Sequence, residues 1–148
     1  MFSSFFHQKT ALVGAGKFCV RFLTHFFRPD AAQTPDIIGV ADRDPNAPGI
    51  ALAKSLGIPT ATDYHDFAWL GGLQVILEMS NDPTLADAIK AQMPDHIRVM
   101  DHYETRTLFD LLLVQEFRDQ GLAKIRRENW DPEEIQKFLN ITRKKKDG

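Results

Sequence analysis

Short apolar runs and helix-spaced apolar residues alternate along the chain. The first run, Lys9–Val13, stops at Gly14, and a run of this length before a glycine is typical of a buried strand. The clearest run of this kind is Leu73–Met79. Strands are predicted at Lys9–Val13, Asp36–Ala41, briefly within Ile58–Tyr64, at Leu73–Met79 and at His96–Asp101.

Start and stop signals bound the helical segments between these runs. Pro29 ends the first helix, and Gly57 takes the C′ position of the second. Asp82 and Pro83 read as the N-cap and N1 residues of a later helix. Helices are predicted at Gly16–Phe27, Ile50–Leu56, His65–Leu70 (a single turn), Asp82 to about Met93, Tyr103–Lys124, and from Asp131 onward with Glu134 placed for a capping box.

This alternation of strand and helix is typical of a parallel sheet with helices on both faces. Right-handed crossovers favour the strand order 3-2-1-4-5. We therefore expect an α/β fold, a Rossmann-like doubly wound parallel sheet of about five strands with C-terminal helices. Residues 1–124 would form this domain, and residues 125–148 a helical extension with a basic tail.

Charge is distributed unevenly along the 148 residues. The net charge is −2, so the whole molecule is not expected to bind a polyanion. Lys124–Gly148, by contrast, carries eight basic residues against five acidic ones. We interpret the run Arg143–Lys146 as a solubilising tail and expect no nucleic-acid partner.

Three features bear on the compartment. A single cysteine excludes an internal disulfide framework and is typical of a reducing compartment. The start, MFSSFFHQK, lacks the basic and apolar regions of a secretory signal, and no run approaches the ~20 apolar residues of a membrane helix. We expect a cytoplasmic protein with no membrane partner.

Polar residues and glycines gather where the predicted strands end. In an open parallel sheet, ligands bind outside the carboxyl ends of the strands, at the point where the strand order reverses. The candidate contact residues are Gly14, Ala15, Gly16, Lys17 and Phe18 after the first strand, Asp42 and Arg43 after the second, Ser80 and Asn81 after the fourth, and Asp101 and His102 after the fifth.

The first of these turns suits the phosphates of a dinucleotide. Gly14 permits a tight turn, and Gly16 lets a pyrophosphate approach the backbone. The helix that begins near Gly16 offers free N–H groups and a positive dipole end to that anion. The third fingerprint position holds Cys19 instead of Gly or Ala, and an ordinary strand–helix turn with two glycines stays an alternative.

Asp42 bears on the kind of dinucleotide. It follows Gly14 by 28 residues, against about 20 in the usual spacing, and the Pro29–Pro35 loop accounts for the excess. A carboxylate here would accept both ribose hydroxyls and repel a 2′-phosphate, which favours NAD(H) over NADP(H). Arg43 could instead pair with that phosphate, and Asp42 and Asp44 could simply be turn residues.

Cys19 and the pair Asp101 and His102 are candidate reactive groups, and each also has a structural interpretation. Cys19 near a helix N-terminus could be a reactive thiol, but its position facing the strand favours burial. Asp101 and His102 could act as an acid/base pair, or His102 could be an N-cap neighbour or a solvated residue. The histidines and the cysteine lack metal-ligand spacing, so no metal site is expected.

Several stretches carry a resemblance to known proteins: VGAGKFC, IIGVADRDPNAPGIALAKSLGIPTATDYHDF and GGLQVILEMSND. Over roughly Lys9–Asp101 the chain resembles the N-terminal Rossmann domain of glucose–fructose oxidoreductase/inositol dehydrogenase-type enzymes, homoserine dehydrogenase and dihydrodipicolinate reductase. GKFC, GVADRDPNAPGI, TDY and RVMDH are also similar to a Rossmann module that precedes bacterial sensor kinases. The resemblance implies NAD(P) contacts at Gly14, Gly16, Lys17, Phe18, Asp42, Arg43, Ser80 and Asn81.

The sequence also departs from the oxidoreductases. Their Glu-Lys-Pro signature, with its catalytic lysine, is replaced by MDHYETR, and only 47 residues follow Asp101 where a substrate domain would stand. We therefore expect a dinucleotide-binding module without complete catalytic machinery, which is sensory, regulatory or an assembly partner. The alternatives are a small NAD(P)-dependent oxidoreductase that completes its site in a homodimer, and an interaction module that binds no nucleotide.

The C-terminal helices carry more apolar surface than one sheet face needs. We expect a homodimer to bury this apolar surface through these helices. The alternative is that the last helix folds back over the sheet edge and buries the surface within one chain. The apolar residues are Leu108, Leu111, Leu112, Leu113, Val114 and Phe117, followed by Trp130, Ile135, Phe138, Leu139 and Ile141.

Overall fold

The computed structural model describes residues 2–128, 131–137 and 140. Its contacts divide the chain into two compact units, Met1–Phe109 and Asp110–Gly148. The expected basic run Arg143–Lys146 and the apolar positions Trp130, Phe138, Leu139 and Ile141 lie outside the described residues.

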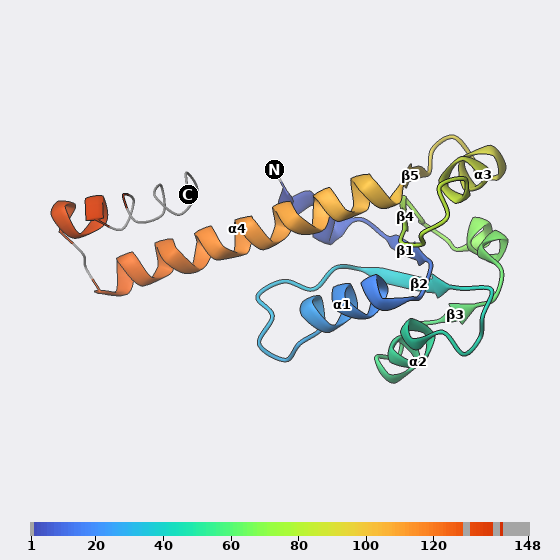
Figure 1. Ribbon diagram of the computed structural model, residues 1–148, viewed down its shortest axis with the longest axis horizontal. Coiled ribbons are helices and arrows are strands. Elements are labelled where there is room, and N and C mark those ends of the chain that lie inside the picture. The colour runs from blue at the N-terminus through green and yellow to red at the C-terminus, as the bar shows by residue number, and fades with distance from the viewer. Residues whose placement is uncertain (1, 129–130, 138–139, 141–148) are drawn as a thin grey trace. The chain divides into compact units, whose positions relative to one another are not determined.

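The first unit is built on one parallel sheet (Figure 1). Its strand order is β3-β2-β1-β4-β5, which confirms the predicted order and the α/β fold class. In register, Val13 of β1 pairs with Ala41 of β2 and Glu78 of β4, so three strand ends meet at one edge. The strands are β1 (Thr10–Val13), β2 (Ile37–Ala41), β3 (Thr60–Ala61), β4 (Val75–Glu78) and β5 (Arg98–Met100).

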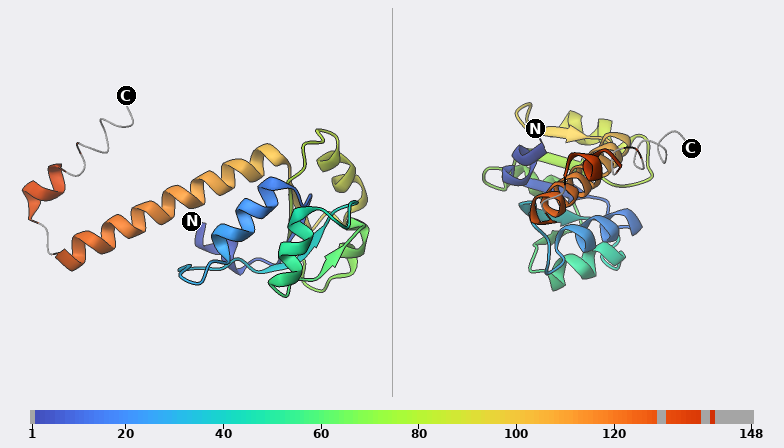
Figure 2. Two further views of the ribbon diagram at one scale, coloured as in Figure 1. Left: turned by 60° about the horizontal axis from the view of Figure 1, so that its bottom comes forward. Right: turned by 90° about the vertical axis from the view of Figure 1, so that its left-hand side faces the viewer.

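Helices cover both faces of this sheet (Figures 1 and 2). Successive strand residues point to opposite faces, so Ala11 and Val13 face one layer while Leu12 faces the other. Ala11 and Val13 pack with Phe67 and Ile89. The helical elements are η1 (Phe2–His7), α1 (Lys17–Phe26), α2 (Pro48–Ser55), η2 (Tyr64–Trp69), α3 (Leu85–Gln92) and α4 (His102–Glu128).

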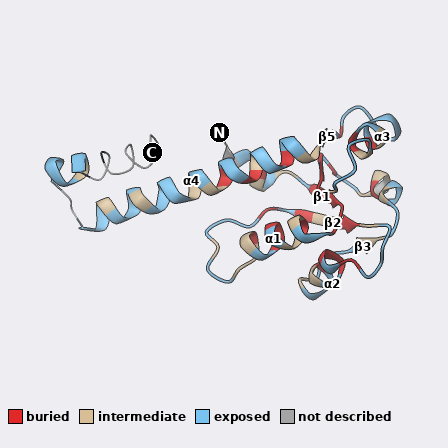
Figure 3. Ribbon diagram, viewed as in Figure 1, coloured by how far each residue is buried: buried red, intermediate tan, exposed pale blue. Residues whose placement is uncertain are grey.

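The central strands β1 and β4 are buried at every position, whereas the edge strands β3 and β5 are only partly buried (Figure 3). An aromatic cluster joins α1 to the first turns of α4: Phe109 lies 5.8 Å from both Phe22 and Phe26, measured between ring centroids. Rings at this separation pack favourably. This packing fixes the start of α4 beside the sheet's β5 end.

The helix boundaries that differ most from the sequence prediction are the start of α3 and the end of α4, and α2 begins at Pro48, two residues before its predicted start. The third α-helix begins at Leu85, because Asp82 Oδ1 accepts bonds from the N–H and hydroxyl of Thr84 and forms a separate turn before the helix. Prediction of Asp82 as the N-cap was therefore wrong. α4 also extends past the expected Lys124 to Glu128. The helix over 132–137 starts where Asp131 predicts it, with Asp131 Oδ1 accepting from the N–H of Glu134.

Candidate functional site

The turn after β1, here called the glycine turn (Gly14–Phe18), needs glycine at its first position. Gly14 has φ +103°, a left-handed conformation that side chains rarely adopt. A Cβ on Gly14 would lie 2.8 Å from the backbone N of Ser80, so the turn runs directly against the end of β4. Its own N–H donates to the carbonyl of Ala41 (2.8 Å). Gly14 therefore locks the ends of β1, β2 and β4 together.

Asp42 holds the same turn from the end of β2. Its Oδ2 accepts a hydrogen bond from the N–H of Ala15 (2.7 Å), and its Oδ1 accepts one from the N–H of Asp44 (2.9 Å). The second bond is the turn interaction that the DRDP sequence favours. A carboxylate has about four acceptor positions, so Asp42 keeps capacity for a ligand hydroxyl.

Helix α2 packs directly against the glycine turn and the start of α1. The N–H of Gly49 donates to the carbonyl of Ala15 (2.7 Å), and a Cβ on Gly49 would lie 2.9 Å from Cys19 Sγ. Cys19 is fully buried at this contact, and burial, with the negative charge of Asp42 adding to it, raises the thiol pKa to about 12. The expectation that Cys19 is buried is confirmed. Gly49, which makes this approach possible, was missed by the sequence reasoning.

A pocket of about 200 Å³ opens at the carboxyl ends of β1, β2 and β4. Its volume is below the ~300–1,000 Å³ of a full ligand pocket. Four predicted contact residues line it: Gly14, Asp42, Arg43 and Ser80. Sequence reasoning missed the remaining polar and apolar lining, formed by Thr62, Tyr64, Asp82 and Leu85 together with the strand residues Val13 and Ala41.

Charges around this pocket are mixed. Hydrogen bonds from the N–H and hydroxyl of Thr84 hold the pKa of Asp82 below its usual value, and the positive charge of Arg43 acts in the same direction. The pKa of Asp63 is lowered as well, first by the N–H of His65 and least by Arg43. The charge of Arg43 therefore acts on Asp82, which lines the pocket, and on Asp63, which does not.

The other predicted contact residues lie outside the pocket lining. Gly16, Lys17 and Asn81 are exposed. The Phe18 ring packs edge-on against Phe109, with centroids 5.6 Å apart, and carries the Arg106 guanidinium over its face. The side chain of Phe18 therefore belongs to the packing between α1 and α4.

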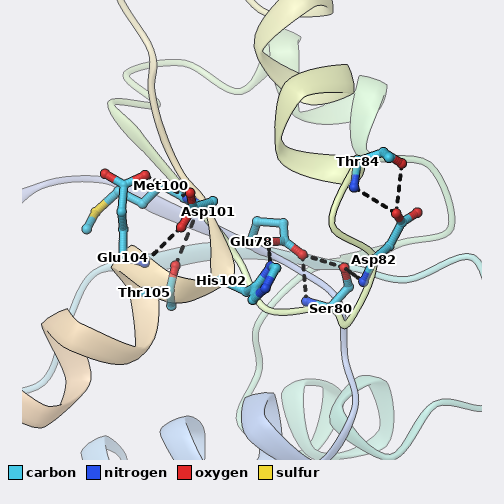
Figure 4. A network of polar contacts seen from close by, with 9 residues as sticks. All are labelled: Glu78, Ser80, Asp82, Thr84, Met100, Asp101, His102, Glu104 and Thr105. Atoms are coloured by element: carbon cyan, nitrogen blue, oxygen red, sulfur yellow. Dashed lines mark hydrogen bonds and ion pairs between the residues drawn. The ribbon is translucent and has the colours of Figure 1, made fainter.

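Next to the pocket, a buried carboxylate joins β4 to α4 (Figure 4). Glu78, fully buried at the end of β4, accepts bonds from the N–H (2.9 Å) and the hydroxyl of Ser80. Its Oε2 lies 3.1 Å from Nδ1 of His102, the first residue of α4. We call Glu78, Ser80 and His102 the Glu78 network. An acidic residue at the end of the apolar run VILE was the one sequence signal for it.

The candidate acid/base residues thus have different roles. Asp101 caps α4, since its Oδ1 accepts from the N–H of Glu104 (2.8 Å) and its own N–H donates to Glu104 Oε1 (3.2 Å). His102 is turned toward Glu78 and is mostly buried.

Comparison with models of protein families gave no match for this chain. Comparison with curated protein sequences gave no significant match either. The sheet order is that of a Rossmann-like fold, and no family is identified.

The described residues lack two further features. No described helix combines the length and the apolar character needed to cross a bilayer. Nowhere in the described part of the chain do three or more His, Cys, Asp or Glu side chains come together in a way that could hold a metal ion.

Proposed function

We propose that the first unit is a dinucleotide-binding module that takes NAD(H) in preference to NADP(H) and acts as a sensory or regulatory domain. The observation that carries this proposal is the pocket at the ends of β1, β2 and β4, lined by Gly14, Asp42, Arg43 and Ser80. A Rossmann-like sheet binds its ligand at this edge, where the strand order reverses.

The phosphates would lie on the glycine turn. Gly16 is exposed, and a Cβ built on it meets nothing within 4 Å, so an anion has room against the backbone. The first N–H groups of α1 have no partner inside the helix and carry its positive dipole end. Lys17, exposed beside them, adds a positive charge.

The adenosine end would occupy the pocket itself. The remaining acceptor capacity of Asp42 suits ribose hydroxyls, and its negative charge opposes a 2′-phosphate. Tyr64 and Leu85 supply apolar surface for a base on the other wall. These contacts support NAD(H), and Arg43 is the residue that would weaken the preference.

A regulatory role draws support from the Glu78 network. Ser80 lines the pocket, bonds to Glu78, and Glu78 contacts the first residue of α4. A ligand that repositions Ser80 would change the partners of Glu78 and, through His102, the start of α4.

An interaction module without nucleotide is the second candidate. Both carboxylate oxygens of Asp42 already accept N–H groups of the protein, which is what a purely structural turn would show. Titration with nucleotides distinguishes the two candidates, because only the dinucleotide-binding module should bind one.

The test is calorimetric titration with NAD(H), NADP(H), adenine nucleotides and S-adenosylmethionine. When the free ligand concentration is ~100 times Kd, binding should raise the free energy of unfolding by about 2.7 kcal/mol. Gly16→Val should abolish binding, because its side chain fills the space left for phosphate. Gly71→Val is the matched control, since Gly71 is also exposed with open space at its Cβ, and it lies outside the pocket lining.

Two results would contradict the proposal. If none of these ligands binds the parent protein, the interaction module is the better description. If Gly16→Val binds as tightly as Gly71→Val, the ligand lies elsewhere.

A further inference from the structure

A second cavity lies at the amino ends of the strands, on the opposite edge of the sheet from the pocket described above. Its volume is about 430 Å³, which falls within the ~300–1,000 Å³ of ligand pockets. All of its lining residues belong to the first unit. The lining has three polar side chains, Lys9, Gln74 and His96, and an apolar wall that includes Leu70, Leu73 and Ile97. We call it the amino-edge cavity.

Pairing of the strands builds the base of this cavity. Lys9, Gln74 and Ile97 directly precede β1, β4 and β5, and the first residues of these three strands lie opposite one another in the pairing register. The Lys9 carbonyl accepts hydrogen bonds from the N–H groups of Gln74 (2.9 Å) and Val75 (3.2 Å), and the Lys9 N–H donates to Gln74 Oε1 (3.0 Å). These bonds hold Lys9 and Gln74 side by side.

The polar side chains at the amino-edge cavity offer hydrogen-bond donors. Gln74 uses its Oε1 on the Lys9 N–H, so its amide NH2, which has no acceptor among the described residues, is the group left for a ligand. Within the described part of the chain, neither the Lys9 ammonium nor the His96 ring forms an ion pair. None of the described residues that line the cavity is acidic, and Asp95, the exposed neighbour of His96, lies outside the lining. This set of donors favours an anion.

Gly72 makes room for the Lys9 side chain in this cavity. Gly72 has φ +82°, and a Cβ built on it would lie 2.9 Å from Lys9 Cδ and 3.2 Å from Lys9 Nζ. The lysine side chain therefore occupies space that any other residue at position 72 would fill. Gly57 has a similar φ of +77°, but a Cβ built on it meets nothing within 4 Å. The contact with Lys9, and not the backbone conformation, thus distinguishes Gly72.

We propose that the amino-edge cavity binds a small organic carboxylate with an apolar body. Its carboxylate would accept hydrogen bonds from the three donors, and bonds between an ammonium and a carboxylate are among the strongest in proteins. Its apolar body would lie on Leu70, Leu73 and Ile97, where Leu70 packs on the core to which Leu73 and Ile97 belong. An inorganic anion would leave this wall uncovered. Because the dinucleotide is proposed for the carboxyl ends of the strands, this site does not depend on it.

The first experiment titrates the full chain, labelled with ¹⁵N, with hexanoate and with benzoate and follows the backbone amides by NMR. The amides of Lys9, Gly72, Gln74 and Ile97 should shift, and that of Gly14 should not. Hexanamide and benzamide keep the apolar body without the charge, and inorganic phosphate has charge without the body. Each of these three should bind about tenfold more weakly than the acids, or not at all.

The second experiment removes the donors one at a time. Gln74→Glu keeps an oxygen for the Lys9 N–H and replaces the free NH2 with a negative charge, so the acids should no longer bind while the fold is retained. Lys9→Met keeps an apolar stem without the ammonium and should weaken the acids about tenfold, with the amides unchanged. Lys54→Met is the matched control, since Lys54 is also exposed and lies outside the lining.

The third experiment moves the ammonium without removing it. Gly72→Ala and Gly57→Ala introduce the same backbone strain and should lower the thermal midpoint by similar amounts, but only the first pushes the Lys9 side chain aside. Hexanoate and benzoate should therefore bind more weakly to Gly72→Ala and with parent affinity to Gly57→Ala.

Four results would overturn the proposal. The absence of any shift with either acid at ~10 mM would mean that the cavity takes no such ligand. Equal affinities for benzoate and benzamide, or for benzoate and phosphate, would contradict a carboxylate with an apolar body. Equal affinities of Lys9→Met and Lys54→Met for the acids would exclude the ammonium from the site. Shifts at Gly14 without shifts at Gly72 would place the acid in the other pocket.

Discussion

The glycine turn and the Glu78 network lie at the same edge of the sheet and are built in different ways. The glycine turn is held mainly through its own backbone: Gly14 lies against Ser80, the Gly14 N–H bonds to the Ala41 carbonyl, and the Ala15 N–H bonds to the Asp42 carboxylate. The Glu78 network is held by side chains, with Glu78 at its centre and fully buried. The first N–H groups of α1, at the end of the turn, have no partner inside the helix, whereas the Glu78 network uses its polar groups on one another. If the proposed function holds, the ligand would bind at the glycine turn and the Glu78 network would transmit the change to α4.

The largest effect should come from Gly14→Ala. The substitution forces an alanine into φ +103° and pushes its Cβ to 2.8 Å from the Ser80 backbone. Strain of this kind costs about 1–3 kcal/mol before the clash is added, so we expect a loss of about 4 kcal/mol in the free energy of unfolding. Urea denaturation measures it. A loss below about 1 kcal/mol would show that the turn is more adaptable than its geometry indicates.

Glu78→Ala should rank next. It leaves the Ser80 N–H, the Ser80 hydroxyl and the His102 ring without their buried acceptor, which should cost about 3 kcal/mol. Glu78→Gln keeps one carbonyl oxygen for Ser80 and should cost about 1 kcal/mol. Equal losses for the two variants, again by urea denaturation, would mean that packing rather than hydrogen bonding explains the role of Glu78.

Cys19, the residue after the glycine turn, should make the free energy of unfolding depend on pH above pH 9. Its pKa is raised from 9.0 to about 12 in the folded protein. Above pH 9 the unfolded chain releases the thiol proton while the folded chain keeps it, so stability is full below pH 9 and falls toward pH 12. The expected slope is about 1.4 kcal/mol per pH unit. Cys19→Ala should lack this part of the slope, as denaturation at pH 8 and pH 10 can show; parallel curves for the two proteins would contradict it.

The smallest expected effect belongs to Asp42→Asn. The amide oxygen can still accept from the Ala15 N–H, so the fold should lose only about 1 kcal/mol. If the proposed function holds, losing the charge should narrow the affinity gap between NAD(H) and NADP(H). Calorimetry with both ligands checks this, and Asp44→Asn, in the same turn but outside the pocket lining, is the control. An unchanged ratio of the two affinities would show that Asp42 does not determine the preference for NAD(H).

Sequence alone determined the sheet order, the glycine turn and the place of Asp42 beside it. Each follows from rules that act over short stretches: a buried run ends at a glycine, a right-handed crossover follows, and an aspartate begins a turn. The Asp82 boundary failed because an Asx turn and a helix cap use the same residue types, and the side chain of Thr84 decided between them.

Only the tertiary structure decided the partners of residues far apart in the chain. Glu78 and His102 meet because β4 pairs with β5, whose chain continues into α4. Gly49 meets Cys19 because α2 packs against α1, and Thr62 and Tyr64 reach the pocket because β3 pairs with β2. Local propensity fixes what each segment becomes, but burial and strand pairing fix which side chains face one another. The turn at Gly14 and the place of Asp42 at the same sheet edge could therefore be predicted, whereas the Ala15–Asp42 hydrogen bond, the approach of Gly49 and the Glu78 network could not.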